Sequence, residues 1–299
     1  MLFSLTPENL IRDFGLNTPC GRGMVTALYD ALSGASPQVR ELLLNAWLAD
    51  TGRVEKLGAR VQAREKRAWS ELAAVLELKY RDLEQEFLLI SLHTYFTILV
   101  KMLAIPLMGF NYPNIGDIGV EGMWDWARAV ENNRIFNLAD DLKGAASPWY
   151  LQAWTPDLAE ALGLLVNILE GYDFSPARLP PGDIMQHLYH SLIPPALRHG
   201  LGEYYTPGWL VEYLYSLLDP DICSFTAADN EGGLLDPACG SGAFLLKALK
   251  SLRDKATARG IKNEEILEAA SRLVVGVDRN PLAVLSARVN YLMAVADLV

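Results

Sequence analysis

Apolar residues recur at three- and four-residue intervals through most of the first half of the chain. The interval is clearest over residues 36–105, where leucine and alanine dominate "RELLLNAWLAD" and "ELAAVLELKYRDLEQEFLLISLHTYFTILVKMLA". Such spacing places the apolar side chains on one face of a helix. Further helices are predicted over "VEGMWDWARAVENN", "TPDLAEALGLLVNILEGY" and "DIMQHLYHSL". In the second of these, Thr155 suits the N-cap and Pro156 the first helical turn.

The pattern changes after a Pro- and Gly-rich stretch, "SPARLPPGD", at residues 175–183. Downstream, short apolar runs at 234–236 and 273–277 predict two strands, each followed by a helix. We therefore expect an all-helical domain over residues 1–180 and, over 181–299, an α/β part that is the start of a Rossmann-like sheet. A stable sheet needs about three or more strands. We thus expect the second part to be incomplete and to be completed by a missing C-terminal region or by an additional subunit.

Composition indicates an ordinary globular protein, with 51% apolar and 21% charged residues. The three cysteines have no regular spacing, which argues against a disulfide framework and against a zinc site. The N-terminus lacks the apolar core of a signal peptide. The most apolar segment, residues 87–100, is shorter than the ~20 residues that span a bilayer, so we interpret it as a core helix. We expect a cytoplasmic protein without a membrane partner.

The net charge of −10 argues against general adhesion to nucleic acid, whose phosphates attract basic surfaces. A local basic stretch remains a candidate contact and consists of Arg53, Lys56, Arg60, Arg64, Lys66 and Arg67. The alternative, which we favour, is that these residues form a solvated helix face.

Candidate chemistry lies in "LLDPACGSGAFLLKAL" at residues 234–249. The first strand ends at Asp236, and Gly240 and Gly242 permit a tight turn and close approach of a ligand to the backbone. In α/β folds, ligands bind beyond the carboxyl ends of strands, and an acid there, such as Asp278 after the second strand, accepts hydrogen bonds from ribose hydroxyls. Asp236 would repel a phosphate and suits an ammonium group. The two acids therefore favour S-adenosylmethionine over a dinucleotide.

Three motifs resemble those of amino-group DNA methyltransferases, the N6-adenine type of restriction–modification and phage-defence systems. "LLDPACGSGAFL" resembles the family's cofactor motif, and "GVDRNPLAV" is similar to its second motif. "LGEYYTP" at 201–207, followed by the predicted helix "GWLVEYLYSLL", resembles the motif that precedes the first strand. "YHSLIPPALRHGLGEYYTP" is also similar to large single-chain enzymes that combine methylation with DNA cleavage.

This resemblance implies eight cofactor-binding residues and no metal ligand. Tyr205 and Thr206 would contact the methionine carboxylate or its surroundings; Asp236, Ala238, Gly240 and Gly242 would line the methionine and sulfonium region; Asp278 would hold the ribose, and Arg279 would lie against the adenine. Two alternatives stay open. Asp278 could instead be the N-cap of a helix that starts at Pro281, and Tyr204 and Tyr205 could be core aromatics. Cys239 is interpreted as a small buried residue and not as a nucleophile.

The family's catalytic motif, an Asn/Asp/Ser-Pro-Pro-aromatic tetrapeptide that grips the flipped base, does not occur in the sequence. The nearest match, residues 147–150 ("SPWY"), lacks the second proline, and we reject it. We also reject a nuclease site at residues 77–79 ("ELK"), which lie in a helical pattern. We assign no catalytic residue.

The resemblance implies that residues 181–299 are the N-terminal half of an S-adenosylmethionine-dependent methyltransferase domain, incomplete as it stands. The full-length protein would methylate adenine N6 in double-stranded DNA, and this chain alone would be inactive. The alternative is a non-catalytic subunit of a DNA-modification complex that binds cofactor or a partner.

Overall fold

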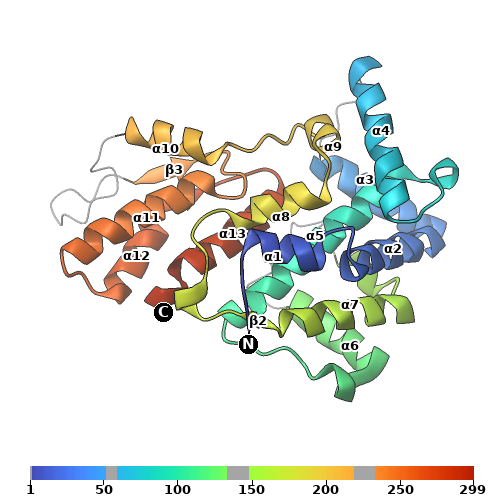
Figure 1. The fold of residues 1–299 in the computed structure, drawn as a ribbon, viewed down its shortest axis with the longest axis horizontal. Coiled ribbons are helices and arrows are strands. Elements are labelled where there is room, and N and C mark those ends of the chain that lie inside the picture. The colour runs from blue at the N-terminus through green and yellow to red at the C-terminus, as the bar shows by residue number, and fades with distance from the viewer. Residues whose placement is uncertain (1, 52–58, 133–147, 219–232) are drawn as a thin grey trace. The chain divides into compact units, whose positions relative to one another are not determined.

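The computed structural model describes residues 2–51, 59–132, 148–218 and 233–299. The chain forms two compact units. The first comprises Met1–Tyr172 and His187–Tyr204, and the second comprises Asp173–Gln186 and Tyr205–Val299. Figure 1 shows that helices dominate both. The expected boundary between residues 180 and 181 stays a prediction.

The first unit is helical, as the apolar spacing predicts. Its helices are α1 (Pro7–Phe14), α2 (Pro19–Gly34), α3 (Pro37–Thr51), α4 (Ala59–Val75), α5 (Gln85–Leu107), α6 (Ile115–Glu131), α7 (Pro156–Leu169) and α9 (Pro195–Gly200), with short 3₁₀ turns η1 (Tyr80–Asp82) and η2 (Trp149–Leu151). A minimal pair of strands joins β1 (Phe3–Ser4) to β2 (Tyr172–Asp173). As predicted, the Thr155 side chain caps α7 by accepting a hydrogen bond from Leu158 N (3.2 Å).

Helix α5 forms the core of this unit, and α2, α3 and α7 pack against it. It is longer than the apolar segment 87–100 suggested, because the helix continues through Pro106 to Leu107. Two helical stretches, α5 and Pro281–Leu298, are long and apolar enough to cross a membrane by length and composition alone. The apolar window of α5 is entirely buried inside the protein, which fits the predicted core helix. A cytoplasmic location stays a prediction.

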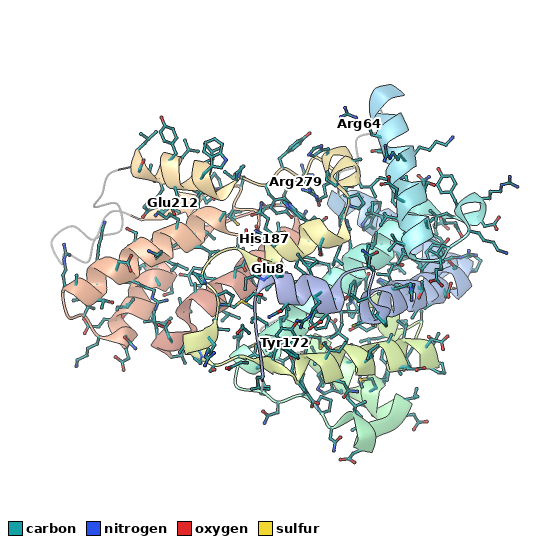
Figure 2. All side chains as sticks on the ribbon, viewed as in Figure 1. Glu8, Arg64, Tyr172, His187, Glu212 and Arg279 are labelled. Carbon is teal, nitrogen blue, oxygen red and sulfur yellow. The ribbon has the colours of Figure 1, made fainter. Side chains whose placement is uncertain are left out.

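Two details of the first unit correct or complete the sequence interpretation. Helix α4 ends at Val75, and Glu77 has a left-handed φ of 59°, so the expected helix across residues 77–79 is wrong. The basic residues Arg64 (labelled in Figure 2), Lys66 and Arg67 are exposed on α4, whereas residues 53 and 56 lie outside the described part of the chain. Arg67 forms an ion pair with Glu71 (2.7 Å), as expected of a solvated helix face.

The second unit surrounds a short parallel strand pair. Its elements are η3 (Pro176–Arg178), α10 (Gly208–Ser216), β3 (Leu234–Asp236), α11 (Ala243–Ala258), α12 (Asn263–Leu273), β4 (Val274–Gly276), α13 (Pro281–Val295) and η4 (Ala296–Leu298); α8 (Ile184–Leu192) begins in this unit and continues into the first. Strand β3 pairs with β4 so that Asp236 lies opposite Gly276. Leu234 and Val274 face a core formed with α11, α12 and α13.

The predicted Rossmann-like sheet is wrong. Both predicted strands form, but among the described residues the strands amount to two pairs only, β1–β2 and β3–β4, and 71% of the structure is helical. The physical reason is the length and period of the apolar runs. Each strand of the second pair has three residues, and the longer apolar stretches around them have helical spacing and form α11, α12 and α13.

Candidate functional site

The turn between β3 and α11, residues 237–242, is fixed by backbone hydrogen bonds. Val277 N donates to Asp236 O (2.8 Å) and Cys239 N donates to Val277 O (2.9 Å), which extends the parallel ladder beyond the strands. Gly240 and Gly242 have left-handed φ values of 55° and 94°. Residues with a side chain rarely adopt this conformation, so the backbone conformation of the turn accounts for glycine at both positions.

Asp278 joins the end of β4 to this turn. Its Oδ2 accepts a hydrogen bond from Gly240 N (2.8 Å), and its Oδ1 accepts one from Asn280 N (2.8 Å). The N-cap of α13 is Asn280, whose side chain accepts from Leu282 N (3.0 Å). The alternative that Asp278 is the N-cap is therefore wrong. A carboxylate has about four acceptor positions, so the half-buried Asp278 retains capacity for further donors.

The second acid, Asp236, flanks the same turn. Its Oδ1 accepts from Ala238 N (3.1 Å), and the carboxylate is half-buried. Burial raises the pKa of the Cys239 thiol to about 11, and the negative charges of Asp278 and Asp236 contribute. Cys239 is 7% exposed and its thiol is protonated at neutral pH, which fits a small buried residue. Both acids act electrostatically on this one thiol and thus lie near it.

The start of α11 leaves room for a ligand. A Cβ built on Gly240 would meet no atom within 4 Å, so a ligand could approach the backbone there. Gly242 supplies no side-chain cap, and the first turn of α11 carries no acid. The positive end of the helix dipole favours a negative ligand group. The turn therefore offers acids to a cationic group and a helix N-terminus to an anionic one.

The remaining predicted cofactor-binding residues are Arg279, Tyr205 and Thr206. Arg279 is exposed next to Asp278 (Figure 2). Tyr205 and Thr206 are half-buried in the segment before α10, and the hydrogen bonds that tie Asp278 to the turn do not include them. Tyr204 is 75% exposed and stacks on His199 (5.1 Å between ring centres), so its interpretation as a core aromatic is wrong.

Thr206 differs from the other threonines that precede a proline at a helix start. Thr6, Thr18 and Thr155 each accept a hydrogen bond from a backbone N–H of the helix that follows. Thr206 also precedes a proline, but α10 begins at Gly208 with Pro207 as its N-cap and with no side-chain cap. Thr206 therefore does not cap α10. The N-cap role that accounts for the other three threonines does not account for Thr206.

The structure gives residues 149 and 150 a structural role. Trp149 and Tyr150 are each 2% exposed. Trp149 Nε1 donates to Thr94 Oγ1 (2.9 Å), and the Tyr150 hydroxyl donates to Glu131 Oε1 (2.8 Å). Buried rings cannot stack on a flipped base, which agrees with the rejection of this segment as a catalytic motif; its residue 147 lies outside the described ranges.

Sequence reasoning missed two residues that contact the turn, Asp183 and Asn290. Asp183 Oδ2 accepts a hydrogen bond from Ser241 Oγ, and its Oδ1 accepts one from Asn290 Nδ2 (2.7 Å). Two weak signals were available: Asp183 directly precedes a predicted helix, where acids act as caps, and Asn290 is a polar residue within an apolar helix. Neither signal indicates that these residues meet.

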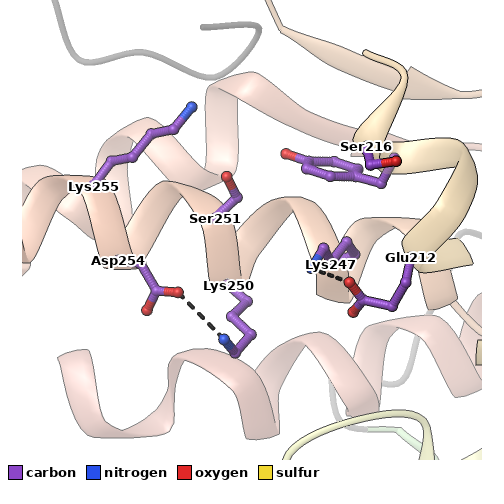
Figure 3. Close-up of a pocket in the computed structure, with 8 residues that line it drawn as sticks. Glu212, Ser216, Lys247, Lys250, Ser251, Asp254 and Lys255 are labelled. Carbon is purple, nitrogen blue, oxygen red and sulfur yellow. Dashed lines mark hydrogen bonds and ion pairs between the residues drawn. The ribbon is translucent and has the colours of Figure 1, made fainter. Parts of the chain in front are cut away.

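A separate groove of about 370 Å³ lies between α10 and α11 (Figure 3). It is lined by Glu212, Tyr215, Ser216, Lys247, Lys250, Ser251, Asp254 and Lys255. Lys247 pairs with Glu212, and Lys250 pairs with Asp254 (3.3 Å). The groove contains none of the predicted cofactor residues. Within the described ranges, no group of three or more His, Cys, Asp or Glu side chains could hold a metal ion.

Comparison with known proteins yields one family match. Residues 182–298 match the model of a family described as N-6 DNA Methylase. Searches of curated proteins and of solved structures found no match. The matched segment includes both acids, the glycine-rich turn and the Tyr205–Thr206 segment. Over residues 182–298, the chain is thus similar to the N-6 DNA methylase family.

Proposed function

We propose that the glycine-rich turn binds S-adenosylmethionine and that the chain is the cofactor-binding part of a DNA adenine-N6 methyltransferase. The observation that carries this proposal is the hydrogen bond from Gly240 N to Asp278, which brings the second acid to the turn across 38 residues of sequence. The family match supports it, because members of this family generally use S-adenosylmethionine.

The residues around the turn fit this cofactor group by group. Asp278 keeps acceptor positions for the ribose hydroxyls, and Asp236 suits the ammonium group. The N-terminus of α11, with Thr206 and Tyr205, suits the methionine carboxylate. Ala238, Gly240 and Gly242 allow the ligand to approach the backbone, and Arg279 would lie beside the adenine. The bound cofactor would supply the sulfonium methyl group that is transferred.

The target would be double-stranded DNA, in restriction–modification or phage defence. The group that holds the adenine amine in this family, an Asn/Asp-Pro-Pro-aromatic motif, does not occur among the 299 residues. We therefore propose that methyl transfer requires a further polypeptide segment and that this chain alone binds the cofactor without methylating DNA. Its own residues hold and orient the cofactor.

Calorimetric titration of the full chain tests the proposal. S-adenosylmethionine should bind at one site, and NAD⁺ should give no binding heat, because Asp236 at the mouth of the turn repels phosphates. A folded chain that releases no heat with S-adenosylmethionine, or that prefers NAD⁺, would contradict the proposal. Incubation with DNA and methyl-labelled cofactor should transfer no label, and labelled adenine would contradict the predicted inactivity of the chain alone.

A further inference from the structure

Ser241 occupies a special position in the turn, between Gly240 and Gly242. Both neighbours have left-handed φ values and no side chains, so neither can anchor the turn through side-chain contacts. Ser241 is 3% exposed, and both its hydroxyl and its carbonyl oxygen form hydrogen bonds. Its hydroxyl donates to Asp183 Oδ2, and its carbonyl oxygen accepts from Asn290 Nδ2 (2.9 Å). The turn is thus fixed to the rest of the unit at its only residue between the two glycines.

Asp183 lies at the centre of these contacts. Its carboxylate accepts hydrogen bonds from Ser241 Oγ in the turn, from Asn290 Nδ2 in α13 (2.7 Å) and from Gln186 N in the first turn of α8 (2.8 Å). These donors come from three separate elements of the second unit. The amide of Asn290 is 1% exposed and faces two acceptors, Asp183 Oδ1 and Ser241 O, which fixes its orientation with the nitrogen toward them.

We propose that Asp183 is a positioning residue that holds the glycine-rich turn in its cofactor-binding conformation. This inference rests on the proposed function of the turn. Asp183 acts through Ser241 and not by touching the cofactor. Glycines have the largest conformational freedom of all residues, so this anchor adds to the backbone hydrogen bonds of the turn by restraining the residue between Gly240 and Gly242. Fixing the turn before binding removes an ordering cost and so raises cofactor affinity.

The negative charge of a carboxylate strengthens the hydrogen bonds at position 183. An ionised carboxylate only accepts hydrogen bonds, and here it meets three donors. Asparagine has nearly the same shape, and in Asp183→Asn its amide nitrogen would face Ser241 Oγ, a hydroxyl that can rotate to accept. The substitution therefore removes the negative charge that strengthens all three hydrogen bonds, while the volume of the side chain is nearly unchanged.

Hydrogen–deuterium exchange of the full chain tests the anchor without any ligand. In Asp183→Asn, amides of residues 238–246 should exchange at least tenfold faster than in the wild type, and those of α12 should be unchanged. Ser241→Ala removes only the hydroxyl contact and should accelerate the same amides. Because Asp183 and Ser241 act through one hydrogen bond, the double variant should exchange no faster than the more severe single variant.

Asp173→Asn is the matched control. Asp173 is an exposed carboxylate of the same unit that accepts hydrogen bonds from Ser175 N (3.0 Å) and Ser175 Oγ, so its chemistry resembles that of Asp183. Its replacement should leave exchange at residues 238–246 unchanged. Equal exchange of these residues in the wild type and Asp183→Asn would overturn the proposal. If Asp183→Asn does not fold, unchanged exchange in Ser241→Ala overturns it.

Cofactor affinity provides the second readout. The dissociation constant for S-adenosylmethionine should rise at least tenfold in folded Asp183→Asn and remain unchanged in Asp173→Asn. Faster exchange with equal affinity would show an anchor that does not serve cofactor binding, and this would overturn the positioning role. A wild-type chain that fails to bind S-adenosylmethionine contradicts the proposed function itself, and the exchange experiment distinguishes this failure from a failure of the anchor.

Discussion

Gly276→Ala should destabilise the second unit by crowding the turn against β4. A Cβ at this position would lie 2.5 Å from Leu245 Cδ1, 2.9 Å from Cys239 Cβ and 3.0 Å from Cys239 Sγ. Gly276 does not have a left-handed φ, so alanine is allowed by the backbone and the obstacle is steric alone. Leu245 can rotate its end, but Cys239 Cβ belongs to the turn and moves only with the backbone.

The expected cost is about 1–3 kcal/mol of unfolding free energy, the usual range for an overpacked core. It includes a strained hydrogen bond from Cys239 N to Val277 O, worth about 1 kcal/mol. Urea unfolding followed by circular dichroism measures the change. Gly208→Ala is the matched control, because a Cβ there meets nothing within 4 Å at the start of α10. If both alanine variants are equally stable, the close packing of the turn on β4 is refuted.

Two further predictions concern the first unit. Burial lowers the pKa of His93 to about 3, so the unfolded chain binds a proton below pH 6.5 that the folded chain does not. The unfolding free energy should thus fall by about 2 kcal/mol between pH 7.5 and pH 5.0. The His93→Gln variant should lose this part of the dependence of unfolding free energy on pH. An equal dependence in both proteins would contradict the burial of a neutral His93. Glu131→Ala should cost about 3–5 kcal/mol because it leaves Lys101 buried without its ion-pair partner, whereas Asp254→Ala, at an exposed pair, should cost under about 1 kcal/mol in the same urea assay.

Local sequence pattern predicted the turn well, because its determinants lie close together in the chain. A short apolar run followed by an acid and two glycines placed the end of β3 at Asp236 and predicted a helix after it, as observed. The proximity of Asp278 to the turn also followed from sequence, since parallel strands bring their carboxyl ends to one edge. The hydrogen bond to Gly240 agrees with this argument.

Features that depend on distant or unusual contacts were not predictable. Asp183 and Asn290 are 107 residues apart, and no local pattern pairs them. The break at Glu77 requires a left-handed φ at a residue that is not glycine, which helical spacing does not reveal. The Rossmann-like sheet was wrongly expected, because a short apolar run indicates the presence of a strand but not the number of its neighbours. The role of Asp236, Asp278 and the turn in cofactor binding stays a proposal.

The most direct test of the cofactor site is whether Asp278 recognises the ribose hydroxyls. Calorimetry should compare S-adenosylmethionine with its 2′,3′-dideoxy analogue on the wild type and on Asp278→Ala. Charge-assisted hydrogen bonds contribute about 1.5–3 kcal/mol each, so the wild type should bind the analogue at least tenfold more weakly. Asp278→Ala should bind both ligands with nearly equal affinity, even if its turn is loosened by loss of the Gly240 contact. If Asp278→Ala still discriminates between the two ligands as strongly as the wild type, the ribose assignment is contradicted.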